Sequence, residues 1–120
     1  MNLLGVLAVA IAGGIGSMLR YLVDNSIPAR VRERFPWGTA LVNVTGSFIL
    51  GVVIGSISET LPTFWGDVIG VGLLGGYTTF STVSLDTVRL ALKRRRWAAA
   101  LNGIGTLIVC VIVALLGFAL

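Results

Sequence analysis

The chain has 120 residues, of which 56% are hydrophobic and only 12% are charged, and its formal net charge is +4. So many apolar residues, arranged in long runs, cannot be covered by the polar surface of a soluble domain. The sequence contains no His and a single Cys, which argues against histidine metal sites, catalytic triads and an intrachain disulfide.

Four runs lack Asp, Glu, Lys and Arg and are each long enough to cross about 30 Å of hydrocarbon as a helix. They are Asn2–Leu19, Trp37–Ser58, Val68–Leu85 and Trp97–Leu120. We therefore predict one all-α integral membrane domain over 1–120, with four transmembrane helices at about 2–24, 36–58, 65–92 and 97–119. Because no carboxylate falls inside these runs, we expect neither an enzyme nor a carboxylate proton relay.

The first predicted helix is rich in small residues. No Lys or Arg precedes its apolar run, so we expect a membrane helix rather than a signal peptide. Gly13, Gly14 and Gly16 permit close contact with another helix, and such contact drives helix association in lipid. The alternating charges of 30–34 in the loop that follows are compatible with a short interfacial helix.

Polar and small residues recur at helical spacing in the second and fourth predicted helices. Gly51 and Gly55 have the spacing of one packing face, and Asn43 precedes that face by two turns. In the fourth helix a polar stripe recurs every four residues, at Asn102, Thr106 and Cys110. Either these groups join helices by hydrogen bonds, or they line a polar path.

The third predicted helix contains the most informative segment of the chain. Residues 75–82 read GGYTTFST, and we expect the helix to be broken from Gly75 to Thr79. Backbone groups freed at bilayer depth meet no water, so they must be buried in protein, line an aqueous path or hold an ion. A helix kink without an ion is the alternative that the residues leave open.

Basic residues are confined to the first and third loops and the helix ends beside them. They are Arg20, Arg30, Arg32, Arg34, Arg89, Lys93, Arg94, Arg95 and Arg96. The positive-inside tendency predicts that these loops face the cytoplasm and that both termini lie outside, in a plasma (inner) membrane. Beside a membrane helix, the run 93–96 indicates topology and lipid headgroups rather than nucleic acid.

Three ordered motifs resemble those of the Fluc (CrcB) family of fluoride channels, and the resemblance covers essentially the whole chain. The motifs are GGIGSMLRY at 13–21, GTALVNVTGSF at 38–48 and GGYTTFST at 75–82. The resemblance implies an antiparallel dimer of the dual-topology type, with narrow pores built from both subunits. Through these pores fluoride would leave the cytoplasm passively, which gives fluoride resistance.

The resemblance also implies roles for individual residues. Asn43 would donate hydrogen bonds to the ion, and Phe80 would present its ring edge to it. The backbone carbonyls of Gly75 and Thr78 would hold a structural Na⁺ on the dimer axis, and Arg20 would lie near the vestibule. The remaining residues of the implied fluoride path are Ser81, Thr82, Val83, Asn102, Thr106 and Cys110.

Two departures from the family pattern leave alternatives open. The family commonly has a second Phe where this chain has Val83, which offers the anion no aromatic edge. The one-sided charge also disfavours insertion in both orientations, so we hypothesise a heterodimer with a homologue of opposite bias. The alternatives are a non-conducting structural subunit and a small four-helix multidrug/proton exporter, which would need a carboxylate within the membrane.

Overall fold

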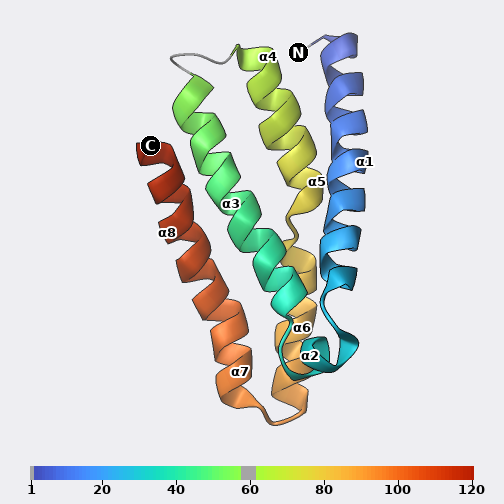
Figure 1. The fold of residues 1–120 in the computed structure, drawn as a ribbon, viewed down its shortest axis with the longest axis vertical. Helices are drawn as coiled ribbons and strands as arrows, with labels where there is room; N and C mark the ends of the chain where they lie inside the picture. Colours follow the sequence, from blue (N-terminus) through green and yellow to red (C-terminus); the bar gives the residue numbers. More distant parts are fainter. Residues whose placement is uncertain (1, 58–61) are drawn as a thin grey trace.

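The computed structural model describes residues 2–57 and 62–120, and these residues are almost entirely helical, without a strand (Figure 1). The first half contains α1 (Leu3–Ser26), α2 (Ala29–Arg34) and α3 (Trp37–Ile57). The third span is built from α4 (Thr63–Gly66), the π-helix η1 (Asp67–Leu74), α5 (Gly75–Tyr77) and α6 (Phe80–Leu92). The last span is built from α7 (Arg96–Ala100), the π-helix η2 (Leu101–Gly105) and α8 (Thr106–Ala119).

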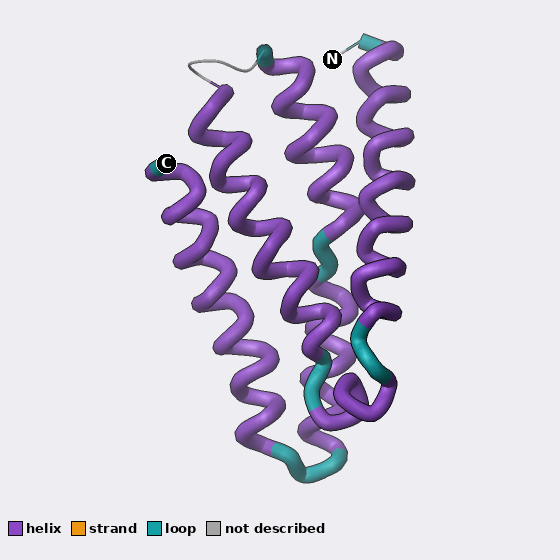
Figure 2. The backbone as a smooth tube through the Cα atoms, viewed as in Figure 1, coloured by secondary structure: helices purple, strands orange, loops and turns teal. Residues whose placement is uncertain are grey.

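The prediction of four membrane-spanning helices is confirmed. The described residues contain four helical stretches of sufficient length and hydropathy, at Leu3–Ser26, Trp37–Ile57, Thr63–Leu92 and Arg96–Ala119. The end predicted for the second helix, Ser58, lies outside the described residues. The break predicted between Gly75 and Thr79 is present but narrower, because only Thr78 and Thr79 leave the helical conformation (Figure 2).

Local sequence explains where the first helices begin and end. The Asn2 side chain caps α1 by accepting a hydrogen bond from the backbone N–H of Gly5, with an O···N distance of 2.8 Å. The helix ends at Ser26, and the next residue, Ile27, has the extended backbone that a following proline favours. The residues after Pro28 then form α2, the short helix that the sequence allowed in the first loop.

Two pairs of helices pack closely through glycine. α1 lies along η1 and α5, and α3 lies along α8 (Figure 1). A Cβ atom added at Gly76 would collide with the backbone of Gly13, and one added at Gly51 would collide with the backbone of Ala114. Glycine at these positions is what allows the backbones to touch, which is the packing that membrane helices use. The predicted packing role of the second helix's glycines is therefore confirmed.

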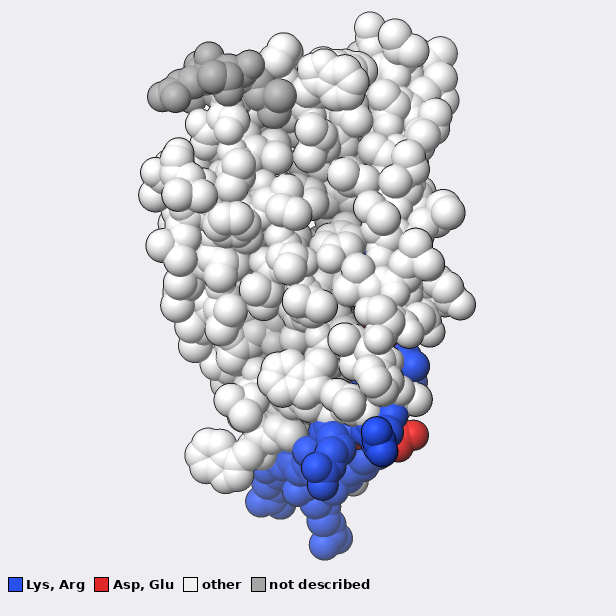
Figure 3. All heavy atoms as spheres, in the orientation of Figure 1, with Lys and Arg blue, Asp and Glu red and all other residues white. Residues whose placement is uncertain are grey.

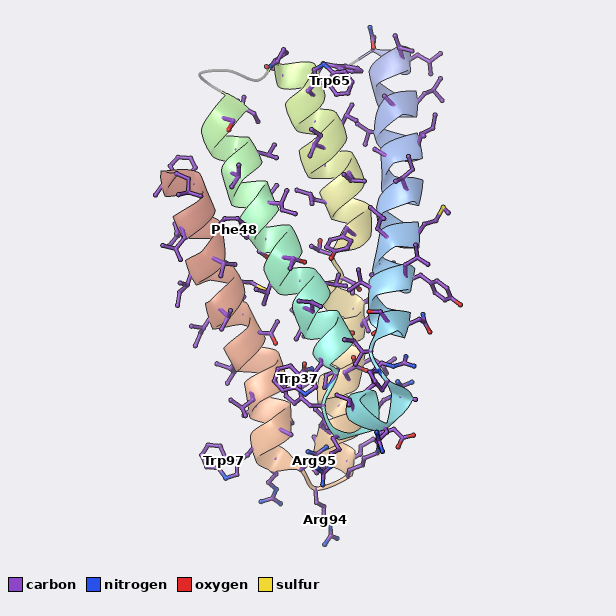
Figure 4. All side chains as sticks on the ribbon, viewed as in Figure 1. Trp37, Phe48, Trp65, Arg94, Arg95 and Trp97 are labelled. Atoms are coloured by element: carbon purple, nitrogen blue, oxygen red, sulfur yellow. The ribbon has the colours of Figure 1, made fainter. Side chains whose placement is uncertain are left out.

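The surface divides into a wide apolar belt and one basic end. Most large apolar side chains of the described spans are exposed, and most basic residues gather around α2, the end of α6 and the turn between α6 and α7 (Figure 3). Trp37 and Trp97 lie toward this basic end, and Trp65 lies at the opposite end (Figure 4). Indole rings favour the membrane–water interface, so the tryptophans mark the two edges of an apolar layer.

Candidate functional site

The break in the third span is held open by Asn43 of α3. Its Oδ1 accepts a hydrogen bond from the backbone N–H of Thr79 at 2.9 Å, and its Nδ2 donates to the Thr79 carbonyl at 3.0 Å. The same Nδ2 donates to the Thr39 carbonyl at 3.1 Å. This network fixes the amide orientation, because Nδ2 faces two carbonyls and Oδ1 faces an N–H. Asn43 therefore replaces the helical hydrogen bonds that an extended Thr79 has lost.

Threonine side chains satisfy further backbone groups around the break. Thr79 caps α6, with its Oγ1 accepting from the backbone N–H of Thr82 at 3.3 Å. The Thr78 hydroxyl donates back to the Leu74 carbonyl at 2.8 Å. These hydroxyls explain why the sequence GGYTTFST can leave the helix here without a solvent-exposed loop.

Two carbonyls lose their usual helical donors at the same place. In a continuous α-helix the N–H of Thr79 would donate to Gly75 and that of Thr82 would donate to Thr78. Here the first donates to Asn43 and the second to the Thr79 hydroxyl. Gly75 and Thr78 both line the same cavity beside the break. Neutral carbonyl oxygens freed in this way are suitable ligands for an alkali cation.

That cavity, of about 270 Å³, lies between α3, the broken third span and the last span. No charged residue lines it. It contains five of the side chains predicted for a fluoride path, namely Asn43, Phe80, Val83, Thr106 and Cys110. The Phe80 ring is 78% exposed in the single chain, whereas Val83 is only 6% exposed. Phe80 is thus the aromatic group of this lining that remains free to meet an ion or a second subunit.

A second cavity, of about 380 Å³, lies on the α1 side of the break. Arg20 lines it together with Ser17, Thr39, Thr79 and Thr82, so a guanidinium and several hydroxyls face one space. Asp24 also lines it and is paired with Arg32 at 3.8 Å. Thr79 is the residue that the two cavities share. The structure therefore places Arg20 and Thr82 on one side of the break and Phe80 on the other.

Two of the predicted path residues lie outside both cavities. Asn102 is fully buried and donates through Nδ2 to the Val83 carbonyl at 3.2 Å and to the Thr87 hydroxyl at 2.9 Å. Within the described residues its Oδ1 has no partner. Ser81 lies 3.2 Å from the Thr79 hydroxyl, oxygen to oxygen, and is exposed. Asn102 thus joins the last span to α6 by hydrogen bonds. The other two residues of the polar stripe, Thr106 and Cys110, line the cavity.

The third span contains two carboxylates, Asp67 near its start and Asp86 near its end. The helical stretch Thr63–Leu92 includes Asp86, whose side chain is only 17% exposed. It accepts a hydrogen bond from Thr39 Oγ1 at 3.5 Å and lies 3.7 Å from Arg89. The expectation of no membrane carboxylate considered only the uncharged run Val68–Leu85, whereas both the predicted helix 65–92 and the observed stretch Thr63–Leu92 include Asp86. Its four-residue spacing from Thr82 puts Asp86 on the same side of α6 as Thr82 and was the available signal.

Comparison with known proteins gives a consistent result. Residues 7–118 match the family described as CrcB-like protein, Camphor Resistance (CrcB). The chain is 47% identical over 118 residues to Fluoride-specific ion channel FluC 1 of Leifsonia xyli subsp. xyli, covering 98% of this chain and 86% of that protein. It is 41% identical over 111 residues to Fluoride-specific ion channel FluC 2 of Mycobacterium tuberculosis, covering 92% and 86%. It is 43% identical over 114 residues to Fluoride-specific ion channel FluC of Shewanella oneidensis, covering 93% and 91%. The chain therefore belongs to the CrcB family.

Proposed function

We propose that this protein is a fluoride-specific ion channel that lets cytoplasmic fluoride leave the cell passively. The observation that carries the proposal is the uncharged cavity at the helix break, which joins Asn43, Phe80 and Thr106. The similarity to proteins named as fluoride-specific channels supports the same conclusion. An inside-negative potential drives an anion outward with about 2.3 kcal/mol per charge per 100 mV, so no other energy source is required.

The chemistry of this cavity suits a small, strongly hydrated anion. Such an ion enters a narrow passage only if donors replace its water, yet fixed cations there would hold it too tightly to leave. The Thr106 hydroxyl and the positive edge of the Phe80 ring are neutral groups that can do this. Arg20, on the other side of the break, raises the local anion concentration without standing in the narrow region.

Asn43 can act as a donor only by giving up a bond within the chain. One of its N–H groups donates to Thr39, four residues earlier in α3. That carbonyl is also the helical acceptor for the backbone N–H of Asn43, so it keeps a partner if the side chain turns away. We infer that this N–H is the one redirected to fluoride, while the bonds to Thr79 keep the break open.

A structural Na⁺ at the Gly75 and Thr78 carbonyls is part of the proposal. These oxygens have lost their helical donors and line one cavity, which supports their role as ligands. A single chain offers few such oxygens, so a second chain would complete the site. A cation site shared by two chains favours a dimer with the cation on its axis.

The subunit arrangement and membrane orientation also remain proposals. The basic end would face the cytoplasm and both termini would lie outside, in the plasma membrane. The charge asymmetry in Figure 3 favours insertion one way, and hence pairing with a homologue of opposite bias. A stable, fluoride-conducting antiparallel homodimer made from this gene alone would contradict the heterodimer. The buried, aliphatic Val83 favours one second candidate, a subunit that stabilises the dimer while its partner supplies the conducting pore.

Growth under fluoride tests the proposed function. The chain would be expressed in a fluoride-sensitive bacterium that lacks its own channel, with and without a homologue of opposite charge bias. Restored growth in either case supports a channel, and restoration only with the homologue supports the heterodimer. Growth that stays inhibited in both cases, with the protein present in the membrane, would contradict the proposal.

A further inference from the structure

We propose that a basic groove at one end of the molecule binds the headgroup of an anionic phospholipid. The groove has a volume of about 710 Å³ and lies between α2 and the turn that joins α6 to α7. Its lining residues are Arg30, Glu33, Arg34, Lys93 and Arg95. This site is separate from the fluoride path and goes beyond the proposed function.

The chain builds this groove by tying two distant segments together. The Arg95 guanidinium donates through Nη1 to the backbone carbonyl of Arg34, at the end of α2. The turn is closed by Arg94, whose φ of 61° is unusual for a residue other than glycine. This backbone conformation leaves the Arg94 side chain pointing away from the bundle, while Arg95 lies against it (Figure 4). The cations of the groove are therefore gathered by a specific contact.

Among the residues that the structure describes, no ion pair neutralises the basic side chains of the groove. Among the described residues only two ion pairs form, Arg32 with Asp24 and Arg89 with Asp86. Neither pair includes a cation of the groove, where four basic side chains meet one carboxylate, that of Glu33. Like charges held this close repel one another, so an external anion would lower the free energy of the site.

The depth of the groove identifies the anion as a lipid. Its residues lie just beyond the membrane-spanning stretches that end at Ser26 and Leu92 and that begin at Trp37 and Arg96. Trp37 and Trp97, which are 54% and 85% exposed, lie toward the same end (Figure 4). Indole rings favour the headgroup layer, so the groove opens at the level of lipid phosphates. Basic pockets at this level are typical binding sites for anionic headgroups.

Glu33, the one carboxylate that lines the groove, restricts which anionic headgroups could bind there. Glu33 would repel a headgroup that carries a second acidic group, whereas hydroxyl groups could donate hydrogen bonds to it. Phosphatidylglycerol combines one phosphate with such hydroxyls. It is therefore the lipid to test, with phosphatidylcholine as the zwitterionic reference.

The test is native mass spectrometry of the whole protein, purified with equal amounts of the two lipids. Wild type is compared with the double variant Arg30→Gln/Lys93→Gln and with the matched control Arg94→Gln/Arg96→Gln, whose side chains do not line the groove. Both variants lose the same charge from exposed positions. We expect the groove variant to retain phosphatidylglycerol at least about tenfold less than wild type, and the control to differ by less than about twofold.

Three results would overturn the proposal. Equal losses in the two variants would indicate unspecific attraction, and equal retention of both lipids would exclude a headgroup site. Displacement of the bound lipid by excess inorganic phosphate would assign the groove to a soluble anion. Since the readout is lipid retention, its outcome is independent of whether the protein conducts fluoride.

Discussion

Asn43 and Thr79 are joined by two reciprocal hydrogen bonds, N–H to Oδ1 at 2.9 Å and Nδ2–H to carbonyl at 3.0 Å. A side-chain amide thus imitates the pairing of one backbone unit with another, across 36 residues of sequence. The pairing lets a membrane helix stop at Tyr77 and restart at Phe80 without an unsatisfied amide at Thr79. The same two residues line the cavity proposed to conduct fluoride, so the fold and the proposed function depend on one contact.

We predict that Asn43→Asp blocks fluoride flux and also lowers stability. The carboxylate would place an acceptor 3.0 Å from the Thr79 carbonyl, where the amide now donates. Loss of these bonds in a buried site should cost about 1–3 kcal/mol. Efflux from liposomes measures the fluoride flux, and thermal unfolding in detergent measures the loss of stability.

The matched control is Asn25→Asp, which makes the same change at an exposed residue of α1. The Asn25 amide donates to the Tyr21 carbonyl, four residues earlier. Its replacement should change the free energy of unfolding by less than about 0.5 kcal/mol and leave flux unchanged. Wild-type flux through the Asn43→Asp protein would refute the role given to this amide.

We predict that Phe80→Ile abolishes fluoride flux while the dimer remains intact. The ring is 78% exposed in the single chain, so its removal costs the packing of the chain little. Isoleucine keeps the apolar surface but has no positive edge to offer an anion. Efflux and size-exclusion chromatography of the same sample measure the two properties. Phe118→Ile, the same change near the end of α8, should conduct like wild type, and conduction by Phe80→Ile would contradict the account.

Sodium dependence is the third prediction. If the Gly75 and Thr78 carbonyls hold Na⁺, replacing Na⁺ with a bulky organic cation on both sides should abolish flux and lower the stability of the dimer. Gly75→Ala should be tolerated, because the ligand is the carbonyl and an added Cβ would approach nothing closer than the Gly70 oxygen at 4.0 Å. Full flux without any alkali cation would contradict the proposed ion site.

Alanine substitutions at Gly76 and at Gly14 should have opposite effects on the free energy of unfolding. In Gly76→Ala the new Cβ would collide with the backbone of Gly13, forcing α1 and α5 apart at a cost of about 1–3 kcal/mol. In Gly14→Ala the new Cβ meets nothing within 4 Å, so the better helix former should stabilise α1 by about 0.5–1 kcal/mol. Thermal unfolding of the two variants checks this. Equal effects would show that the contact between Gly76 and Gly13 does not limit helix packing.

Much of this architecture could be predicted from the sequence, because lipid imposes simple rules. Uncharged runs identified the spans, and the glycines at 51 and 55 identified the face of α3 that meets α8. The break was predicted in the right segment, but the predicted range, Gly75 to Thr79, is longer than the observed one, Thr78 and Thr79. Gly75 and Gly76 stay helical, because Asn43 bonds to the backbone of Thr79 alone and only Thr78 and Thr79 are extended.

The sequence alone does not predict which groups the polar side chains hydrogen-bond to. Asn43, Asn102 and Thr106 all appeared as possible ligands for an anion, yet Asn102 donates to Val83 and Thr87 instead. Asp86 was overlooked because charge was counted within uncharged runs, whereas the helix extends beyond them to Leu92. Partner choice depends on how the helices are rotated against one another, and periodicity within one helix does not determine that rotation.

The most direct test of fluoride-selective conduction is efflux from liposomes that contain the purified protein, followed with a fluoride electrode beside a chloride control. The protein is reconstituted alone and together with a homologue of opposite charge bias. We predict rapid loss of fluoride and retention of chloride in at least one of the two preparations. Loss of chloride at a similar rate, or retention of fluoride in both preparations of folded protein, would contradict it.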